Sequence, residues 1–240
     1  MSGGAAVAGP VRFCRVAAWV ALGGAVVSGP LAVWLVQMLR PQPPWRDAQT
    51  FAAAYHPLQT VPYVAGFALV GGLVALVAGL HALAPPPLRA RTTAATASAA
   101  AFAALIVANY ALQTTMVPAL VAAAEPPAVA LAGWITMVNP QGLGWALEMW
   151  GYAVLGGATW LVAPVFAGGD VVATWTRRLF AANGPFSIVG GVATAAWPGW
   201  VLSTPGLMAF ALWNVLVVAM LALAATSLGR TGDAARHGSS

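Results

Sequence analysis

Residues 61–84 read VPYVAGFALVGGLVALVAGLHALA, a run without any aspartate, glutamate, lysine or arginine. At 1.5 Å of rise per residue, a helix of this length crosses the ~30 Å hydrocarbon core of a bilayer. A membrane β-barrel would instead need alternating segments of about ten residues, and none are visible in the chain. The stretch therefore predicts an α-helical transmembrane span.

The composition extends this prediction to the whole chain. Sixty per cent of the residues are hydrophobic and 6% are charged, whereas an ordinary soluble domain carries roughly 25% charged residues. We therefore predict an all-α fold, a polytopic membrane helix bundle of about six transmembrane helices whose composition is typical of small bacterial inner-membrane proteins. The predicted spans are residues 16–38, 61–84, 94–122, 143–165, 186–202 and 206–228, in one domain over 16–228 between an N-terminal segment at 1–15 and a polar tail at 229–240.

Two further stretches are too short to cross a bilayer. Residues 128–138 precede Asn139 and predict an interfacial or re-entrant helix in the loop before the fourth span. Residues 47–55 predict a short helix that begins at an aspartate N-cap and lies flat on the membrane, with Phe51 and Tyr55 facing the lipid.

Arginines orient the predicted bundle. The chain has ten arginines and no lysine, and short cytoplasmic loops are enriched in these residues. With both termini cytoplasmic, only Arg40 and Arg46 fall outside, whereas a five-span bundle would spread the arginines more evenly. We therefore predict a multi-pass protein of the cell membrane with both termini in the cytoplasm, and we expect no nucleic-acid partner. The eight arginines predicted inside are Arg12, Arg15, Arg89, Arg91, Arg177, Arg178, Arg230 and Arg236.

Tryptophans gather on one side of this predicted topology. Tryptophan favours both interfaces of a membrane because its ring is apolar while its N–H needs a partner. A plain interfacial belt would therefore occupy both faces, so the excess on the outer side also fits an aromatic surface or pocket there. The tryptophans predicted at or near the outer side are Trp34, Trp45, Trp134, Trp145, Trp150, Trp197 and Trp200.

Glu148 is the acidic residue that falls clearly within a predicted span. An acidic side chain at the centre of a membrane helix costs on the order of 2.5–3.5 kcal/mol on insertion scales. No arginine falls at the same depth, so Glu148 is expected to be protonated, hydrated from outside, or hydrogen-bonded by Gln113, Asn109 or Asn214. Tyr152 lies four residues further along the same helical face.

These residues define a candidate ligand-binding site in the outer half of the bundle. The amide side chains are equally suited to hydrogen bonds that join membrane helices, so a structural role remains open for them. The candidate ligand-binding residues are Glu148, Tyr152, Gln113, Asn109, Asn214, Trp145, Trp150, Trp213 and His56.

Glycine pairs occur in four of the six predicted spans. Glycine lets helix backbones approach closely in a membrane, so these pairs predict tight packing faces. The pairs are Gly23-Gly24, Gly71-Gly72, Gly156-Gly157 and Gly190-Gly191.

The sequence lacks the residues that several kinds of cofactor, disulfide and metal chemistry require. The absence of lysine excludes a retinal or pyridoxal Schiff base, and the single Cys14 excludes a disulfide within the chain. His56 and His81 fall on opposite faces of the predicted bundle, so they cannot hold one metal ion or haem together. We therefore expect no cofactor and no metal site.

Three functions fit these residues. The first is a non-enzymatic membrane protein that binds an apolar or amphipathic small molecule, or a partner subunit, through its outer half. The second is a proton-coupled transporter in which Glu148 titrates, which requires polar residues that continue toward the inner side. The third is a lipid-modifying enzyme that uses Glu148 and His56, which requires these two residues to meet.

Overall fold

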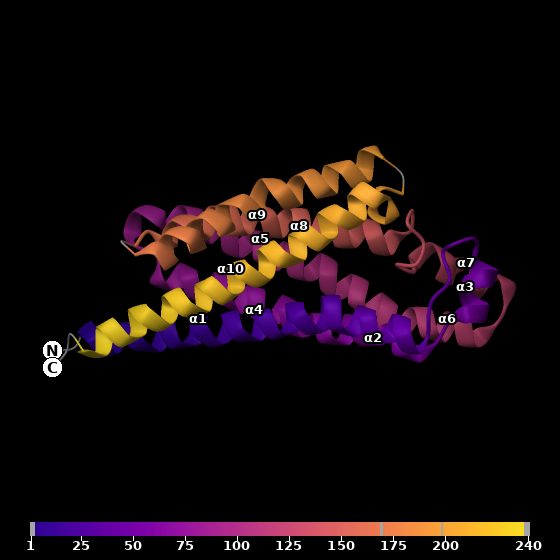
Figure 1. The fold of residues 1–240 in the computed structure, drawn as a ribbon, viewed down its shortest axis with the longest axis horizontal. Coiled ribbons are helices and arrows are strands. Elements are labelled where there is room, and N and C mark those ends of the chain that lie inside the picture. The colour runs from indigo at the N-terminus through magenta and orange to yellow at the C-terminus, as the bar shows by residue number, and fades with distance from the viewer. Residues whose placement is uncertain (1–2, 169, 198, 238–240) are drawn as a thin grey trace.

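The computed structural model describes residues 3–168, 170–197 and 199–237, and every regular element in this part of the chain is a helix (Figure 1). The predicted helix bundle is confirmed, because six helical segments of the described residues are long and apolar enough to span a membrane. These segments are Gly9–Leu39, Pro57–Leu83, Pro86–Ala123, Leu143–Phe166, Val171–Ala196 and Thr204–Asp233.

Each segment is built from one or more helices. The first contains α1 (Gly3–Val26), the π-helical η1 (Val27–Leu31) and α2 (Ala32–Leu39). The second contains η2 (Pro57–Thr60) and α4 (Val61–Leu83), and the third contains η3 (Pro86–Leu88), α5 (Arg89–Ala111), the π-helical η4 (Leu112–Met116) and α6 (Val117–Ala123). The others contain α8 (Leu143–Val162) with η5 (Ala163–Phe166), α9 (Val171–Ala196), and α10 (Thr204–His237).

The fifth helix differs from its predicted span. Helix α9 begins at Val171 and ends at Ala196, whereas the sequence predicted residues 186–202. Asp170 sets the early start, because its carboxylate accepts a hydrogen bond from the Ala173 N–H at 2.6 Å and so caps the first turn. The charged side chains near the start of α9, Arg177 and Arg178, are exposed at the end of the bundle, where they do not oppose helix formation. The predicted span placed them in a loop instead.

The six segments form a closed ring in chain order. Each packs against its neighbours along the chain, α1 with α4, α4 with α5, α5 with α8, α8 with α9 and α9 with α10, and α10 then packs against α1. The start of α1 and the end of α10 lie at the same end of the bundle, here called the termini end, and the opposite end is the distal end (Figure 1). Helix α10 crosses the front of the bundle diagonally, beside α1 at the termini end and beside α9 at the distal end.

Close contacts between helices use one glycine in three of the pairs, and both glycines in Gly190-Gly191. A Cβ on Gly72 would lie 2.5 Å from the backbone nitrogen of Ala21, whereas a Cβ on Gly71 would meet no atom within 4 Å. Gly24 contacts Leu69 in the same way, and no residue larger than glycine fits either site without moving the partner helix. The predicted role of these glycines in packing is confirmed for the members of the pairs that face a neighbouring helix.

Two short helices cover the distal end. Helix α3 (Ala48–Ala54) begins at Asp47, whose carboxylate accepts a hydrogen bond from the Thr50 N–H at 2.7 Å, and this bond lowers the pKa of Asp47. Helix α7 (Pro126–Ile135) corresponds to the short helix predicted at 128–138. The prediction that Phe51 faces lipid is wrong, because α7 folds over α3 and leaves Phe51 only 2% exposed.

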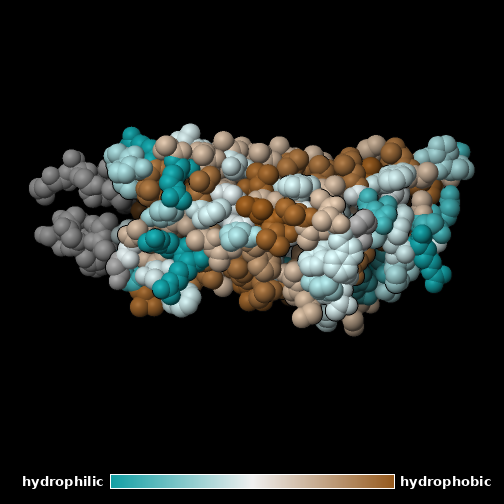
Figure 2. Space-filling view, turned by 90° about the horizontal axis from the view of Figure 1, so that it is seen from above, coloured by the Kyte–Doolittle hydropathy of each residue, from teal (hydrophilic) through white to brown (hydrophobic). Residues whose placement is uncertain are grey.

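The surface follows the membrane topology. Hydrophobic side chains predominate around the middle of the molecule, and hydrophilic side chains gather toward the two ends (Figure 2). This pattern is that of a multi-pass membrane protein with an apolar band between two polar ends. The exposed arginines of the termini end are Arg12, Arg15, Arg89, Arg91, Arg177, Arg178 and Arg230.

Candidate ligand-binding site

A cavity of about 560 Å³ lies in the distal half of the ring. It forms where α10 diverges from η1 and α2. None of the α10 residues from Leu207 to Leu216 is buried, whereas the next turns bury Val217, Met220 and Leu221. The cavity wall combines residues of η1, α2, α4, α8, α9 and α10, so it is completed only when the ring closes.

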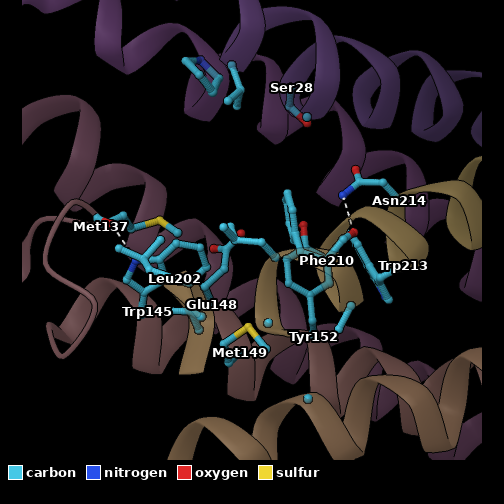
Figure 3. A pocket seen from close by; sticks show the side chains of 18 of the residues that line it. Ser28, Met137, Trp145, Glu148, Met149, Tyr152, Leu202, Phe210, Trp213 and Asn214 are labelled. Carbon is cyan, nitrogen blue, oxygen red and sulfur yellow. Dashed lines mark hydrogen bonds between the residues drawn. The ribbon is translucent and has the colours of Figure 1, made fainter. Parts of the chain in front are cut away.

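The cavity wall is mostly apolar and rich in aromatic rings. Glu148 is the single charged residue among the residues that line it. In Figure 3, Glu148 extends from α8 into the space that Ser28 faces from the opposite wall, with Tyr152, Phe210 and Trp213 beside it. The aromatic lining residues are Trp45, Tyr63, Tyr110, Trp145, Tyr152, Phe186, Trp200, Phe210 and Trp213.

Glu148 is held by two donors from α5. Its Oε2 accepts a hydrogen bond from Asn109 Nδ2 at 2.9 Å, and its Oε1 accepts one from the Tyr110 hydroxyl at 3.1 Å. The Tyr110 hydroxyl also lies 3.4 Å from the Tyr152 hydroxyl. Of the states expected from the sequence, hydrogen bonding by Asn109 is the one observed, whereas Tyr110 was not predicted as a partner.

Gln113 fixes which way the Asn109 amide points. The Met137 backbone N–H donates to Gln113 Oε1 at 3.2 Å, and Gln113 Nε2 donates to the Ile135 carbonyl at 2.8 Å. The same nitrogen donates to Asn109 Oδ1 at 3.1 Å, which leaves Asn109 Nδ2 to face Glu148. The backbone before α8 thus sets the direction of every hydrogen bond in this chain. The two amide side chains, Asn109 and Gln113, are here called the amide relay.

Asn109 and Gln113 share one face because they lie four residues apart, and a π-helical turn begins between them. Asn109, Tyr110 and Gln113 are all buried, and η4 begins directly after α5 at Leu112. A π turn adds a residue to the helical repeat, and such turns are frequent at functional sites. Thr114 supports it, because its hydroxyl donates to the Tyr110 carbonyl at 2.7 Å.

The loop between α7 and α8 is anchored beside the cavity. Trp145 Nε1 donates to the Met137 carbonyl at 2.5 Å, so the ring is fixed against the wall (Figure 3). Asn139 Nδ2 donates to the Gly133 carbonyl at 2.9 Å and ties the loop back to α7. The loop that orients the amide relay is therefore itself held by side chains on both of its flanks.

A second polar cluster continues from the cavity toward the termini end. Trp213 Nε1 lies 3.1 Å from both Asn183 Oδ1 and Ser187 Oγ, and Asn183 Nδ2 donates to Thr159 Oγ1 at 3.0 Å. The ring of Tyr152 meets that of Trp213 edge to face at 4.6 Å between centroids. The sequence did not point to Asn183, because the fifth span was predicted to begin after it.

The predicted site residues divide into three groups. Five of them line the cavity, and two form the amide relay directly behind its wall. Two lie elsewhere, because Trp150 is 45% exposed on the outer surface of α8, and His56 Nδ1 accepts a hydrogen bond from the Leu58 N–H at the start of η2. The five that line the cavity are Glu148, Tyr152, Trp145, Trp213 and Asn214.

Asn214 lies apart from Glu148. Its amide donates to the Phe210 carbonyl of its own helix at 2.9 Å, and a Cβ on Gly29 would lie 2.8 Å from its Oδ1. Asn214 therefore lies where α10 leaves η1, away from Glu148 and on the far side of Phe210 and Trp213 (Figure 3).

No protein-family model, curated protein or solved structure matches this chain. Among the described residues, no group of three histidine, cysteine, aspartate or glutamate side chains comes together as a metal site would require.

Proposed function

We propose that the protein binds an amphipathic small molecule in the distal cavity, as a non-enzymatic protein of the cell membrane with both termini in the cytoplasm. The arginine distribution supports this orientation, because only Arg40 and Arg46 belong to the distal end. The cavity then faces the outer half of the membrane, where a ligand can enter from outside or from the outer leaflet.

The observation that carries the proposal is the combination of size and lining. Ligand pockets commonly enclose about 300–1,000 Å³, with apolar and aromatic walls and a few convergent polar groups, and this cavity encloses about 560 Å³. Burial against the aromatic rings would supply most of the affinity, and Glu148 would set the orientation of the ligand. A small molecule fits better than a partner subunit, because these rings face an internal space.

The amide relay suits a binding role because it holds Glu148 in place before a ligand arrives. Asn109 and Tyr110 occupy one side of the carboxylate, and the backbone before α8 holds Asn109 through Gln113. A preformed polar group loses less conformational entropy on binding than a mobile one.

The test fills the cavity and measures binding by thermal unfolding in lipid nanodiscs. The probes are three compounds with one six-carbon chain and different head groups, namely hexyltrimethylammonium, hexanol and hexanoate. At least one should raise the unfolding temperature of the wild-type protein, because a ligand that binds only the folded state stabilises it. Ala209→Trp, in the cavity wall, should abolish this rise, whereas Ala211→Trp, on the exposed face of the same helix, should keep it. Failure of all three probes to stabilise the wild type would contradict the proposal.

A proton-coupled transporter is the second candidate, favoured by the second polar cluster. Thr159, Asn183 and Ser187 extend hydrogen-bonding groups from the cavity toward the termini end. In proteoliposomes with an internal pH dye, this function requires proton uptake that Glu148→Gln abolishes. No observation favours the lipid-modifying enzyme, since His56 is not among the lining residues.

A further inference from the structure

We infer that the ligand of the distal cavity is an organic cation, an alkyl-substituted ammonium whose positive group rests against Glu148 and whose substituents contact the aromatic wall. This inference rests on the proposed function and specifies its ligand class. It is drawn from the charge of the lining, the direction of the hydrogen bonds at Glu148, and the placement of the rings.

The charge of the lining is unbalanced. Glu148 lines the cavity without any arginine, lysine or histidine beside it. Arg230 forms an ion pair with Asp170 at the termini end, far from the cavity in the fold. A carboxylate in a membrane interior is costly unless an opposite charge or strong donors compensate it. A cationic ligand supplies the opposite charge that the wall lacks.

The groups that contact the Glu148 carboxyl group are able to stabilise a carboxylate anion. Both of its oxygens accept, one from Asn109 and one from Tyr110. Asn109 can only donate, because Gln113 occupies its oxygen, and the carboxylate form of Glu148 lets the Tyr110 hydroxyl donate to it as well. Each carboxylate oxygen has further lone pairs, and Glu148 remains partly accessible on the cavity side. The site is therefore built to present a negative group to its ligand.

The aromatic wall favours an alkylated ammonium over a small inorganic cation. Tyr152, Phe210 and Trp213 stand together, with Tyr152 edge to face on Trp213 and Phe210 stacked on Trp213 at 6.4 Å between centroids. Aromatic faces attract cations through the ring quadrupole, and quaternary ammonium groups are recognised in this way. A metal ion would seek several oxygen ligands, whereas this wall is mostly apolar.

The test compares the head groups of the same three probes in nanodiscs. Hexyltrimethylammonium should stabilise the wild-type protein, and hexanol and hexanoate should do so far less at equal concentration. The chain length is constant, so the difference reports the charge. Glu148→Gln should weaken hexyltrimethylammonium binding by about tenfold or more, because it removes the charge while keeping the side-chain shape.

Two matched controls separate the site from general effects. Glu125→Gln removes the other glutamate of the chain, which is exposed before α7, and should leave ammonium binding unchanged. Trp213→Leu should weaken ammonium binding severalfold, whereas Trp150→Leu, on the outer surface of α8, should not.

The possible outcomes distinguish the inference from the proposed function. If hexanol stabilises the wild type as well as the ammonium does, the ligand class is wrong and the proposed function stands. If hexanoate is the preferred probe, the ligand class is again overturned. These wild-type comparisons decide the matter even if Glu148→Gln does not fold. If no probe binds, both the proposed function and the ligand class fall.

Discussion

The two halves of the bundle pack the same helices in different ways. In the termini half, α1 and α4 approach so closely that Gly72 leaves no room for a Cβ against Ala21. Helix α10 there buries four large side chains against the ring, namely Val217, Met220, Leu221 and Leu228. In the distal half, α10 buries nothing between Leu207 and Leu216, and η1 buries no residue at all. Along the length of the same helices, close packing in the termini half thus changes to a cavity between the helices in the distal half.

The difference teaches where polar groups can be placed in a membrane bundle. Gly72 brings two helix backbones together in a purely apolar contact, whereas Gly66 and Gly144 in the distal half leave room for the side chains of Tyr110 and Gln113. The two π-helical turns, η1 and η4, both lie in this separated half. Function that needs polar chemistry is therefore expected distally, and stability is expected to depend most on the termini half.

The largest effect is expected at a tight contact between two helix backbones. Gly72→Leu should destabilise the protein by about 3 kcal/mol or more, because overpacking costs typically 1–3 kcal/mol and here the obstructing atoms are backbone. The measurement is the unfolding temperature and the monodisperse yield in detergent. Gly71→Leu is the matched control, since its Cβ meets nothing within 4 Å and should leave both unchanged. Equal stability of the two variants would refute the proposed dependence on the termini half.

A smaller loss is expected when the amide relay is broken. Gln113→Leu removes the partner of the Met137 N–H and the Ile135 carbonyl, and it frees the Asn109 amide from its fixed direction. Leaving buried polar groups unpaired costs about 1–3 kcal/mol, which thermal unfolding would detect. Thr114→Val, whose hydroxyl bonds only its own helix, should cost much less. Equal losses in the two variants would mean that the relay contributes nothing of its own.

The boundary between the two halves should be less sensitive still. Trp213→Phe keeps the ring beside Tyr152 but removes the N–H that Asn183 and Ser187 share. We expect a loss of about 1 kcal/mol in unfolding free energy, since Ser187 can still donate to Asn183. Trp160→Phe, on the exposed surface of α8, should be neutral. If Trp213→Phe lowered the free energy of unfolding much more than Gln113→Leu does, the polar cluster around Trp213 would be the more important one for stability.

The smallest effect is expected at the polar end of the termini half. The Ala173 N–H and then Arg230 hold the pKa of Asp170 below its usual range. A depressed folded-state pKa adds stability at neutral pH that is lost as the pH falls through the carboxyl range. Asp170→Asn should therefore be slightly less stable than the wild type at pH 7. The difference should begin to shrink as the pH falls below the usual carboxyl pKa of about 4, and it should vanish only below the depressed pKa of Asp170 in the folded state. If the difference in stability persisted at low pH, its cause would be the hydrogen bond of the N-cap residue to Ala173 and not the charge of Asp170.

The fold was largely predictable because hydropathy and length are local properties. The fifth span was misplaced because Arg177, Arg178 and the Asn183-Gly184-Pro185 run reduce the average hydropathy of a helix that nevertheless continues through them. Such residues are tolerated where they reach the polar end of the bundle or meet partners on other helices, which a single sequence does not reveal.

The site was predictable only in part because it depends on helix rotation. Glu148, Tyr152, Trp145 and Trp213 follow from the cost or preference of each residue type in a membrane. Tyr110 does not, because only the packing of α5 against α8 brings its hydroxyl to Glu148, and a single sequence does not show that packing. Trp150 was expected at the site and instead faces outward, two residues from Glu148 on the helix.

The closed ring of helices has a consequence for how the protein is made. Five of the six contacts join helices that are neighbours along the chain, and these can form as each hairpin enters the membrane. The contact of α10 with α1 joins the last helix of the ring to the first. One side of α1 therefore stays uncovered until α10 has been synthesised. Ring closure is therefore a post-insertion step of assembly, and the last helix to enter completes the enclosure.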